Sequence, residues 1–376
     1  MKLKRFFKKW HEYAPIFTIV VSLLFPIVLI LHILSIFFTP VANFVNRYPA
    51  AGFRFLLAEL TGFIPFSLAE ILLLLLIPAI IVLTVFAIKL CQKEDPKPSR
   101  YYLSTLIGVI FTLYIGYVMT LGTSYFTTTL DRELDLPQID IPDESLYGAT
   151  DRVVFEMAPL LDEITFDENG LSVMPYSRFE LNRKLLAAYE KVTDIYPFIS
   201  NNRSLVKGIL LSEPLTYTHL SGIYTYFTGE ANVNTNFPDS TLVFTTAHEM
   251  AHQRGIGRED EANFVAFLVC MHSDDAYIRY SGYSEMFKYL INALHAADTH
   301  YFNEAYRIAD DRLVNEIYAF NDFYDKYQDN TAADVVGGLN DAYQQMQGIE
   351  AGIKSYGLVV DLAVAYLEVY GTFIPQ

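Results

Sequence analysis

The segment HEMAH at residues 248–252 places two histidines four positions apart, with a glutamate directly after the first. On an α-helix these positions lie on one face about one turn apart, so His248 and His252 can bind the same metal ion. This spacing is typical of zinc-binding helices. Glu249 is then expected on the open side of the metal, where it can act as general base towards a metal-activated water and afterwards protonate a leaving amine.

A catalytic zinc site needs a third protein ligand, because one of its four positions is reserved for water or substrate. The acidic segment EDEANF at residues 259–264 opens the next predicted helix and offers Glu259, Asp260 and Glu261. We expect Glu259 to be the ligand, because Asn263 stands one turn later and can support a ligand histidine. Glu261 is the alternative.

The two cysteines of the chain, Cys91 and Cys270, are expected at a membrane edge and in a globular region. They are not expected to pair, so no disulfide framework is predicted. A cysteine-based zinc site is also excluded, and any metal must be bound by histidines and carboxylates.

The same motif could occur on a solvent-exposed helix that merely carries two surface histidines. Two neighbouring features argue for a site. Gly255 and Gly257 permit the sharp reversal that returns the next helix to the first. The strand-like segment GEANVNTN at residues 229–236 could hold an extended peptide by pairing at a sheet edge.

A peptidase site would also need a donor that stabilises the charge on the attacked carbonyl oxygen. Spacing alone places no residue in this role, and a structural role is the simpler explanation for each candidate. The candidates are Arg254, Tyr280, Tyr283 and His295.

Three long apolar runs precede these residues, at about 14–38, 66–90 and 101–126. Each approaches or exceeds the roughly 20 residues that cross a bilayer core as a helix. Residues 1–126 are therefore expected to form a transmembrane region in contact with the lipid bilayer.

Basic residues flank the three runs unequally. The N-terminal tail contains five, the 89–100 linker contains four, and the loop between the first two runs contains only Arg47 and Arg54. Cytoplasmic segments are enriched in Lys and Arg, so the N-terminus and the linker are predicted to be cytoplasmic and everything after residue 126 extracytoplasmic. Glu70, at the outer end of the second run, is expected to be an interfacial carboxylate, with a proton or partner site as the alternative.

The charge divides the chain in the same way. Residues 1–121 contain 11 basic and five acidic residues, whereas the remainder contains 16 basic and 38 acidic residues. Nucleic-acid binding requires clustered Lys and Arg, so the acidic remainder is not expected to bind nucleic acid.

The fold expected is that of a mainly α membrane protein. Segment 127–149 is acidic and contains prolines, so we expect an extended linker. Residues 150–376 are expected to form an extracytoplasmic, mostly helical α+β domain with short strands within 204–213 and 221–234. Apolar spacing predicts helices at 176–196, 259–271, 284–297, 301–327, 332–345 and 358–370. The last is expected to be a packed helix and not a fourth span.

HEMAH followed by EDEAN resembles the gluzincin metallopeptidases, in which an HExxH helix is joined by a glutamate from the next helix. Glu259, Ala262 and Asn263 match the E-x-x-A-N pattern. The segments FTGEANVN, AHEMAHQRGIGREDEANF and YSGY resemble the uncharacterised bacterial membrane proteins of domain-of-unknown-function family 3810, over most of the chain. The resemblance implies a zincin-like domain in which His248, His252 and Glu259 bind zinc and Glu249 is the general base.

One departure leaves the ligand assignment open. Only seven positions separate His252 from Glu259, which is shorter than in well-studied gluzincins. This tight turn is similar to the metzincin arrangement, but Arg258 stands at the third-ligand position of that group and cannot bind zinc.

The sequence thus favours a membrane-anchored zinc metallopeptidase that cuts proteins or peptides outside the cytoplasmic membrane. The alternative is a non-catalytic zinc-binding or sensing domain on the same anchor. A third hypothesis, an intramembrane protease, is disfavoured because the 248–260 segment is too polar for lipid and lies over a hundred residues beyond the third run.

Overall fold

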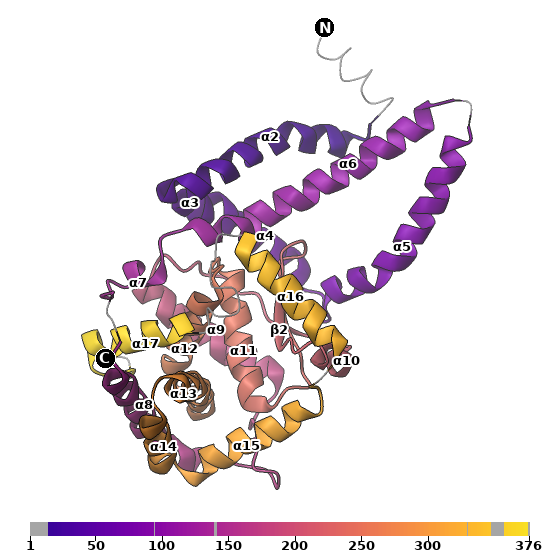
Figure 1. Ribbon diagram of the computed structural model, residues 1–376. Helices are drawn as coiled ribbons and strands as arrows, with labels where there is room; N and C mark the ends of the chain where they lie inside the picture. Colours follow the sequence, from indigo (N-terminus) through magenta and orange to yellow (C-terminus); the bar gives the residue numbers. More distant parts are fainter. Residues whose placement is uncertain (1–13, 94, 139–140, 329, 347–356, 375–376) are drawn as a thin grey trace.

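The structure is a computed structural model that describes residues 14–93, 95–138, 141–328, 330–346 and 357–374, with the side chains of 339–346 not described. The basic N-terminal tail used to predict orientation lies outside the described residues. The described chain is mainly helical (Figure 1). The helices within residues 14–126, called the stem below, are joined to a larger helical domain.

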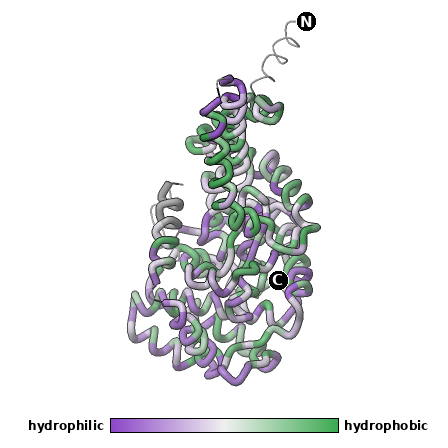
Figure 2. The backbone as a smooth tube through the Cα atoms, turned by 90° about the vertical axis from the view of Figure 1, so that its right-hand side faces the viewer, coloured by the Kyte–Doolittle hydropathy of each residue, from purple (hydrophilic) through white to green (hydrophobic). Residues whose placement is uncertain are grey.

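Three helices of the stem are long and apolar enough to cross a membrane. They are α2 (Ile16–Phe37), α5 (Leu68–Cys91) and α6 (Lys97–Tyr117), the last continuing through π-helix η2 (Val118–Gly122) and 3₁₀-helix η3 (Ser124–Phe126). The stem is the most uniformly hydrophobic part of the chain (Figure 2). The prediction of three candidate spans is confirmed, with starts shifted by two to four residues.

The first and third of these helices, α2 and α6, pack along each other. Phe25 stacks on Phe111 with ring centroids 4.0 Å apart, and His32 Nδ1 lies 2.8 Å from the Tyr114 hydroxyl. Helix α5 instead stands apart and buries none of the 18 residues in its most apolar window (Figure 1). Its apolar side chains are therefore left to contact lipid.

The segment between α2 and α5 was expected to be a loop and is helical. It contains α3 (Thr39–Val45), π-helix η1 (Asn46–Ala50) and α4 (Ala51–Gly62). Helix α4 buries Arg54, Ala58 and Thr61, whereas its opposite face exposes apolar residues. The exposed set comprises Phe55, Leu56 and Leu60. Helix α4 therefore turns its polar contacts inward and an apolar face outward.

Segment 127–149, expected to be extended, is packed and partly helical. It contains α7 (Leu130–Glu133) and the first half of α8 (Asp143–Met157). Leu130, Leu146 and Ala149 are buried in the core of the domain. Acidic residues in the first turn of α8 favour a helix start directly after Pro142.

The domain core is formed by helices that pack around α11 and α12. These two are α11 (Asp239–Gln253) and α12 (Glu259–Met271), which are buried on almost every side. Around them lie η4 (Ala158–Glu163), α9 (Arg178–Ile195), α13 (Ala276–Ala297) and α17 (Leu358–Tyr370). Helix α17 is packed into the core, as expected.

The outer helices of the domain are α14 (Thr299–Ile308), α15 (Asp311–Asp325) and α16 (Thr331–Met346). The single helix expected over 301–327 is therefore broken, because the Asp310 side chain caps the N-terminus of α15 and ends the continuous run. Helix α13 likewise begins at Ala276, earlier than expected, behind an Asp275 cap.

A small sheet lies between α11 and the stem. Its strands are β1 (Lys207–Gly208), β2 (Gly222–Thr225) and β3 (Glu230–Val233), in the order β1-β3-β2. The central β3 pairs parallel with β1 and antiparallel with β2, so β2 is an edge strand. A short helix, α10 (Ser212–Thr216), connects β1 to β2.

Candidate metal centre

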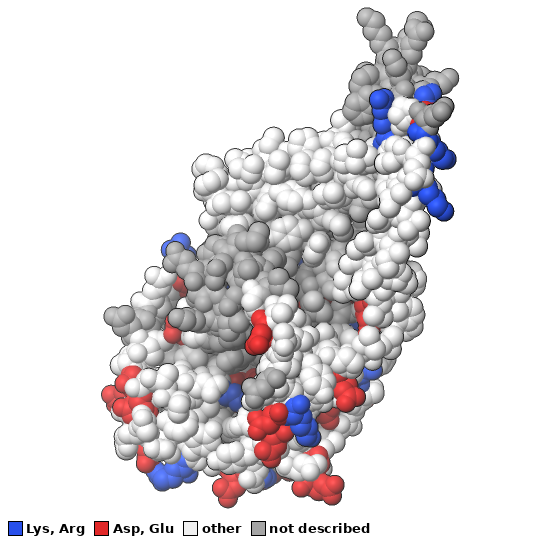
Figure 3. All heavy atoms as spheres, turned by 45° about the vertical axis from the view of Figure 1, so that its right-hand side comes forward, with Lys and Arg blue, Asp and Glu red and all other residues white. Residues whose placement is uncertain are grey.

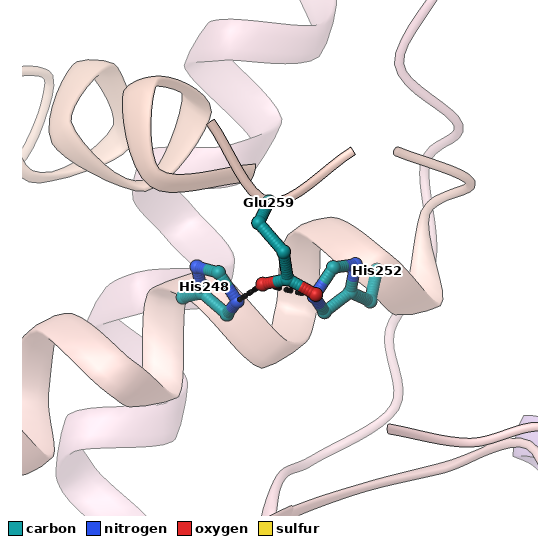
Figure 4. A group of neighbouring side chains, drawn as sticks. All are labelled: His248, His252 and Glu259. Atoms are coloured by element: carbon teal, nitrogen blue, oxygen red, sulfur yellow. Dashed lines mark ion pairs between the residues drawn. The ribbon is translucent and has the colours of Figure 1, made fainter. Parts of the chain in front are cut away.

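Helices α11 and α12 bring His248, His252 and Glu259 together (Figure 4). The Glu259 Oε2 atom lies 3.2 Å from His248 Nε2 and 3.5 Å from His252 Nε2. Two ligands about 2.0–2.1 Å from a tetrahedral zinc ion are separated by roughly 3.3 Å. The three side chains therefore have a spacing that fits a metal ion of this kind.

The histidine rings are oriented for this role by their surroundings. His252 Nδ1 lies 2.8 Å from the Ile256 carbonyl oxygen, so its Nε2 is the nitrogen directed at Glu259. Such a contact fixes the tautomer and the ring plane of a metal ligand. The two rings are nearly perpendicular, with centroids 4.6 Å apart. The Nδ1 atom of His248 is buried and has no hydrogen-bond partner in the part of the chain that the structure describes.

The electrostatics of the cluster favour a charged carboxylate. Burial opposes ionisation of Glu259, but the two adjacent histidines outweigh it and hold its pKa well below the usual range. Burial alone would lower the pKa of His252, yet the Glu259 carboxylate raises it to about 9.

Glu249 lies beside the cluster with an oxygen free for chemistry. Glu249 is 4% exposed, and its Oε2 atom is buried without a hydrogen-bond partner among the described residues. Burial raises its pKa to about 7, despite the opposing effect of the two histidines. A carboxyl group with a pKa near neutrality can both accept and return a proton.

Strand β2 passes directly over this glutamate. A Cβ atom placed on Gly222 would lie 2.5 Å from Glu249 Oε1 and 2.6 Å from Thr245 Cγ2, so only glycine fits. Sequence reasoning missed Gly222, although a glycine inside a strand pattern often marks a close approach.

The structure separates the alternative ligand from the cluster. Glu261 accepts hydrogen bonds from Arg258 Nη1 at 2.7 Å and from the Leu130 backbone N–H at 2.9 Å. Asn263 is buried near the start of α12, and its Nδ2 atom has no partner in the described part of the chain. No hydrogen bond among the described residues joins Asn263 to either histidine, and Ile256 supports His252 instead.

The family model described as "Protein of unknown function (DUF3810)" matches residues 48–364. The chain belongs to the DUF3810 family. No curated protein and no solved structure matches it. The matched range includes α4, α5, α6 and the whole metal centre, so this DUF3810 unit combines membrane helices with the domain.

The four candidate oxyanion donors of this DUF3810 protein have other partners. The Arg254 guanidinium lies 3.9 Å over the Tyr189 ring and donates to the carbonyls of Met250 and Asn202. The hydroxyls of Tyr280 and Tyr283 donate to Glu316 and Glu156, and His295 packs on Phe302. None of these partners is His248, His252 or Glu259.

The turn that joins the ligand helices rests on the stem. Asn46 Nδ2 donates to the Gly255 carbonyl at 3.0 Å, and Arg54 Nη1 donates to Asn46 Oδ1 at 2.8 Å. Gly255 has a φ of +93°, and a Cβ there would collide with the Arg54 guanidinium. Arg258 donates to the carbonyls of Tyr125 and Thr127 just beyond α6. The candidate metal centre of this DUF3810 protein is therefore joined by hydrogen bonds to the part of the chain that contains the candidate membrane helices.

A second junction joins the sheet to α5. The Glu230 carboxylate accepts the backbone N–H groups of Leu68 and Ala69, at 3.1 and 2.8 Å, and pairs with Lys207. Glu70 accepts the N–H groups of Leu210 and Leu211, both at 2.8 Å. Glu70, expected to be an interfacial carboxylate, thus binds the domain backbone.

Proposed function

We propose that this protein is a membrane-anchored zinc metallopeptidase. The observation that carries the proposal is the spacing of His248, His252 and Glu259, which fits a tetrahedral zinc ion. Beside them lies the buried Glu249, whose Oε2 has no hydrogen-bond partner within the described ranges of the chain. The absence of cysteine at the site favours zinc held by imidazole and carboxylate. We take Glu259 as the third ligand, because Glu261 is engaged by Arg258 and Leu130.

A zinc ion bound there would make an adjacent water acidic and polarise a substrate carbonyl. Glu249 then accepts a proton at its carboxylate and delivers it to the departing amine, for which a pKa of about 7 is suited. Burial of Glu249 keeps bulk water from competing for that proton. Gly222 lets the backbone of β2, and a chain lying beside it, approach the carboxylate.

The charge of the described stem supports an extracytoplasmic location for the domain. Basic residues gather at the tip of the stem that is remote from the domain, whereas acidic residues predominate on the domain (Figure 3). The linker at that tip joins α5 to α6 and carries Lys89, Lys93, Lys97 and Arg100. Positive segments remain in the cytoplasm, so we place this tip inside and the domain outside.

One observation favours a second function. Arg254, Tyr280, Tyr283 and His295, the four candidates to stabilise the charge on the substrate carbonyl oxygen, all contact other groups. A peptidase site without such a hydrogen-bond donor loses about 10²–10³ in rate. A domain that binds zinc for sensing or partner binding would not need that donor.

Metal content and cleavage in the full-length protein test the proposal. Full-length chain is required, because the junction with Asn46 and Arg54 is lost in an isolated 150–376 fragment. We expect one zinc per chain, loss of that zinc in His248→Ala, and retained zinc with at least 10²-fold slower cleavage of a peptide library in Glu249→Gln. The exposed Glu213→Gln change is the control.

Zinc binding without any cleavage would favour the sensing function. Absence of zinc from the wild-type protein would remove the basis of both functions.

A further inference from the structure

Strand β2 connects the metal centre to the outer end of a membrane helix. At its start, Gly222 lies against Glu249. Just past its end, the Tyr226 ring meets Tyr117, the last residue of α6, with centroids 5.7 Å apart. Four residues of extended chain cover roughly 13 Å. The distance from the general base to the membrane end of α6 is therefore short and is spanned by one strand.

The free edge of β2 offers hydrogen bonds along this path. The Asn234 N–H donates to the Ser221 carbonyl, so residues 221, 223 and 225 are the ones that bond to β3. By alternation, the N–H and C=O groups of Gly222 and Tyr224 point away from β3. In the described part of the chain no strand pairs with this edge. Gly222 is partly exposed and Ile223 is exposed, whereas Tyr224 is buried, so an extended polypeptide can pair at the Gly222 end of this edge, where it passes Glu249.

The hairpin turn after β2 also lies on the stem. A Cβ on Gly229 would meet Leu57 Cβ of α4 at 2.6 Å, and Gln253 at the end of α11 donates to the Gly229 carbonyl. Gly229, which follows the Tyr226 end of β2, thus lies between α4 and α11. A chain that follows the β2 edge beyond Tyr226 arrives at the outer ends of the spans.

Apolar side chains continue from the stem onto the domain at the start of α5. Leu210 is 67% exposed and Leu211 is 45% exposed, and Glu70 of α5 binds the backbone of both. Ile223 on β2 and Phe63 after α4 are also exposed. Exposed apolar groups beside a transmembrane helix end favour contact with the bilayer over contact with water.

We propose that the substrates are polypeptides anchored in the same membrane, cut within about six residues of the point where they leave the bilayer. This inference rests on the proposed peptidase function. Hydrolysis adds the hydroxyl of one water to the acyl carbon and its hydrogen to the amine nitrogen as the C–N bond breaks. One product therefore stays in the membrane and the other is released outside.

Reporter peptides in lipid nanodiscs test the proposal with full-length, zinc-loaded protein. Each reporter carries the same randomised eight-residue segment. In two of the forms a single transmembrane helix is attached at either end of this segment, directly in one form and through a spacer of 20 Gly/Ser residues in the other. A third form is free in solution. Anchoring raises the local concentration of both tethered forms, so the comparison between spacers isolates the geometry.

We expect the form without a spacer to be cut at least tenfold faster than the form with 20 residues, with cut sites mapping next to the anchor. Equal rates for the two spacers, or faster cleavage of the free peptide, would overturn the inference and leave the peptidase function intact. No cleavage of any form by zinc-loaded protein would reject the peptidase function itself, and the inference with it.

A surface variant provides an independent readout. Leu210→Asp places a charge on the apolar surface outside β2, so we expect slower cleavage of the anchored reporter and an unchanged rate on the free peptide. Ile374→Asp, at an exposed aliphatic residue after α17, is the matched control. An equal effect of both variants on the anchored reporter would contradict a role for this surface in bringing substrate from the membrane.

Discussion

Replacement of Arg54 by methionine tests whether the metal centre depends on the membrane region. Arg54 is buried in α4 and donates to Asn46 Oδ1, to the Asn46 carbonyl and to the Thr120 carbonyl, at 2.8, 2.9 and 3.0 Å. Methionine retains much of the apolar part of the arginine side chain and removes these hydrogen bonds. It also releases Asn46, which holds the Gly255 carbonyl between the ligand helices.

The magnitude follows from two opposing terms. Three hydrogen bonds from a charged donor contribute about 1.5–3 kcal/mol each. Burial lowers the pKa of Arg54 from 12.5 to about 10, which corresponds to about 3 kcal/mol of desolvation recovered when the charge is removed. The net loss is therefore about 1.5–6 kcal/mol in the free energy of unfolding.

Thermal unfolding in detergent and zinc titration measure the two consequences. At about 2 °C per kcal/mol, the midpoint should fall by about 3–12 °C. Zinc affinity should fall about 10–100-fold, as when a group that orients a ligand is lost. The control is Arg47→Met, which removes a half-exposed ion pair with Glu133 and should cost under about 1 kcal/mol. If the two variants unfold alike and bind zinc alike, the metal centre does not depend on the stem junction.

Three further changes probe other parts of the structure. Gly222→Ala should push a methyl group onto Glu249 Oε1 and lower peptidase activity at least tenfold, with the zinc content unchanged. The control Gly148→Ala, at a glycine with open space around it, should leave the activity unchanged. Equal activity of the two variants would refute the close approach of β2 to Glu249. Because Glu259 raises the pKa of His252 to about 9, zinc binding at pH 7 should release a proton, and the apparent zinc affinity should rise with pH up to about 9. Calorimetry in buffers of different ionisation enthalpy measures the number of protons released. A zinc affinity that does not depend on pH would contradict this prediction. Glu230→Gln should cost about 3–5 kcal/mol by leaving Lys207 buried without its partner, in contrast to the exposed Glu213→Gln, and equal thermal midpoints would contradict the second junction.

Local periodicity was enough to predict much of the helical structure. The helices at 259–271 and 358–370 have the predicted bounds, and the three apolar runs are helices of spanning length. The i, i+4 spacing placed His248 and His252 on one face because it depends only on helix geometry. The approach of Glu259 follows from the short turn that Gly255 makes possible.

The partners of these elements could not be predicted, because they come from distant sequence. Asn46 and Gly255 are 209 positions apart, and no local pattern links them. Segment 39–62 was expected to be a loop but is helical. It exposes apolar residues and buries its few polar ones, which is the reverse of the pattern that identifies a helix on the surface of a water-soluble domain. The support expected from Asn263 is instead provided by the Ile256 carbonyl, a backbone group without a sequence signature.

The cap on α5 has a consequence for biosynthesis. Glu230 follows Leu68 by 162 residues, so the carboxylate that binds the first amides of this helix does not yet exist when the helix is made. At about 5–20 residues per second, translation takes roughly 8–32 s to reach it. In the proposed topology, α5 would enter the bilayer before Glu230 can bind its first amides, so this contact forms only after the domain has folded. A chain truncated before Glu230 would leave α5 without that attachment, a state that quality-control proteases could recognise.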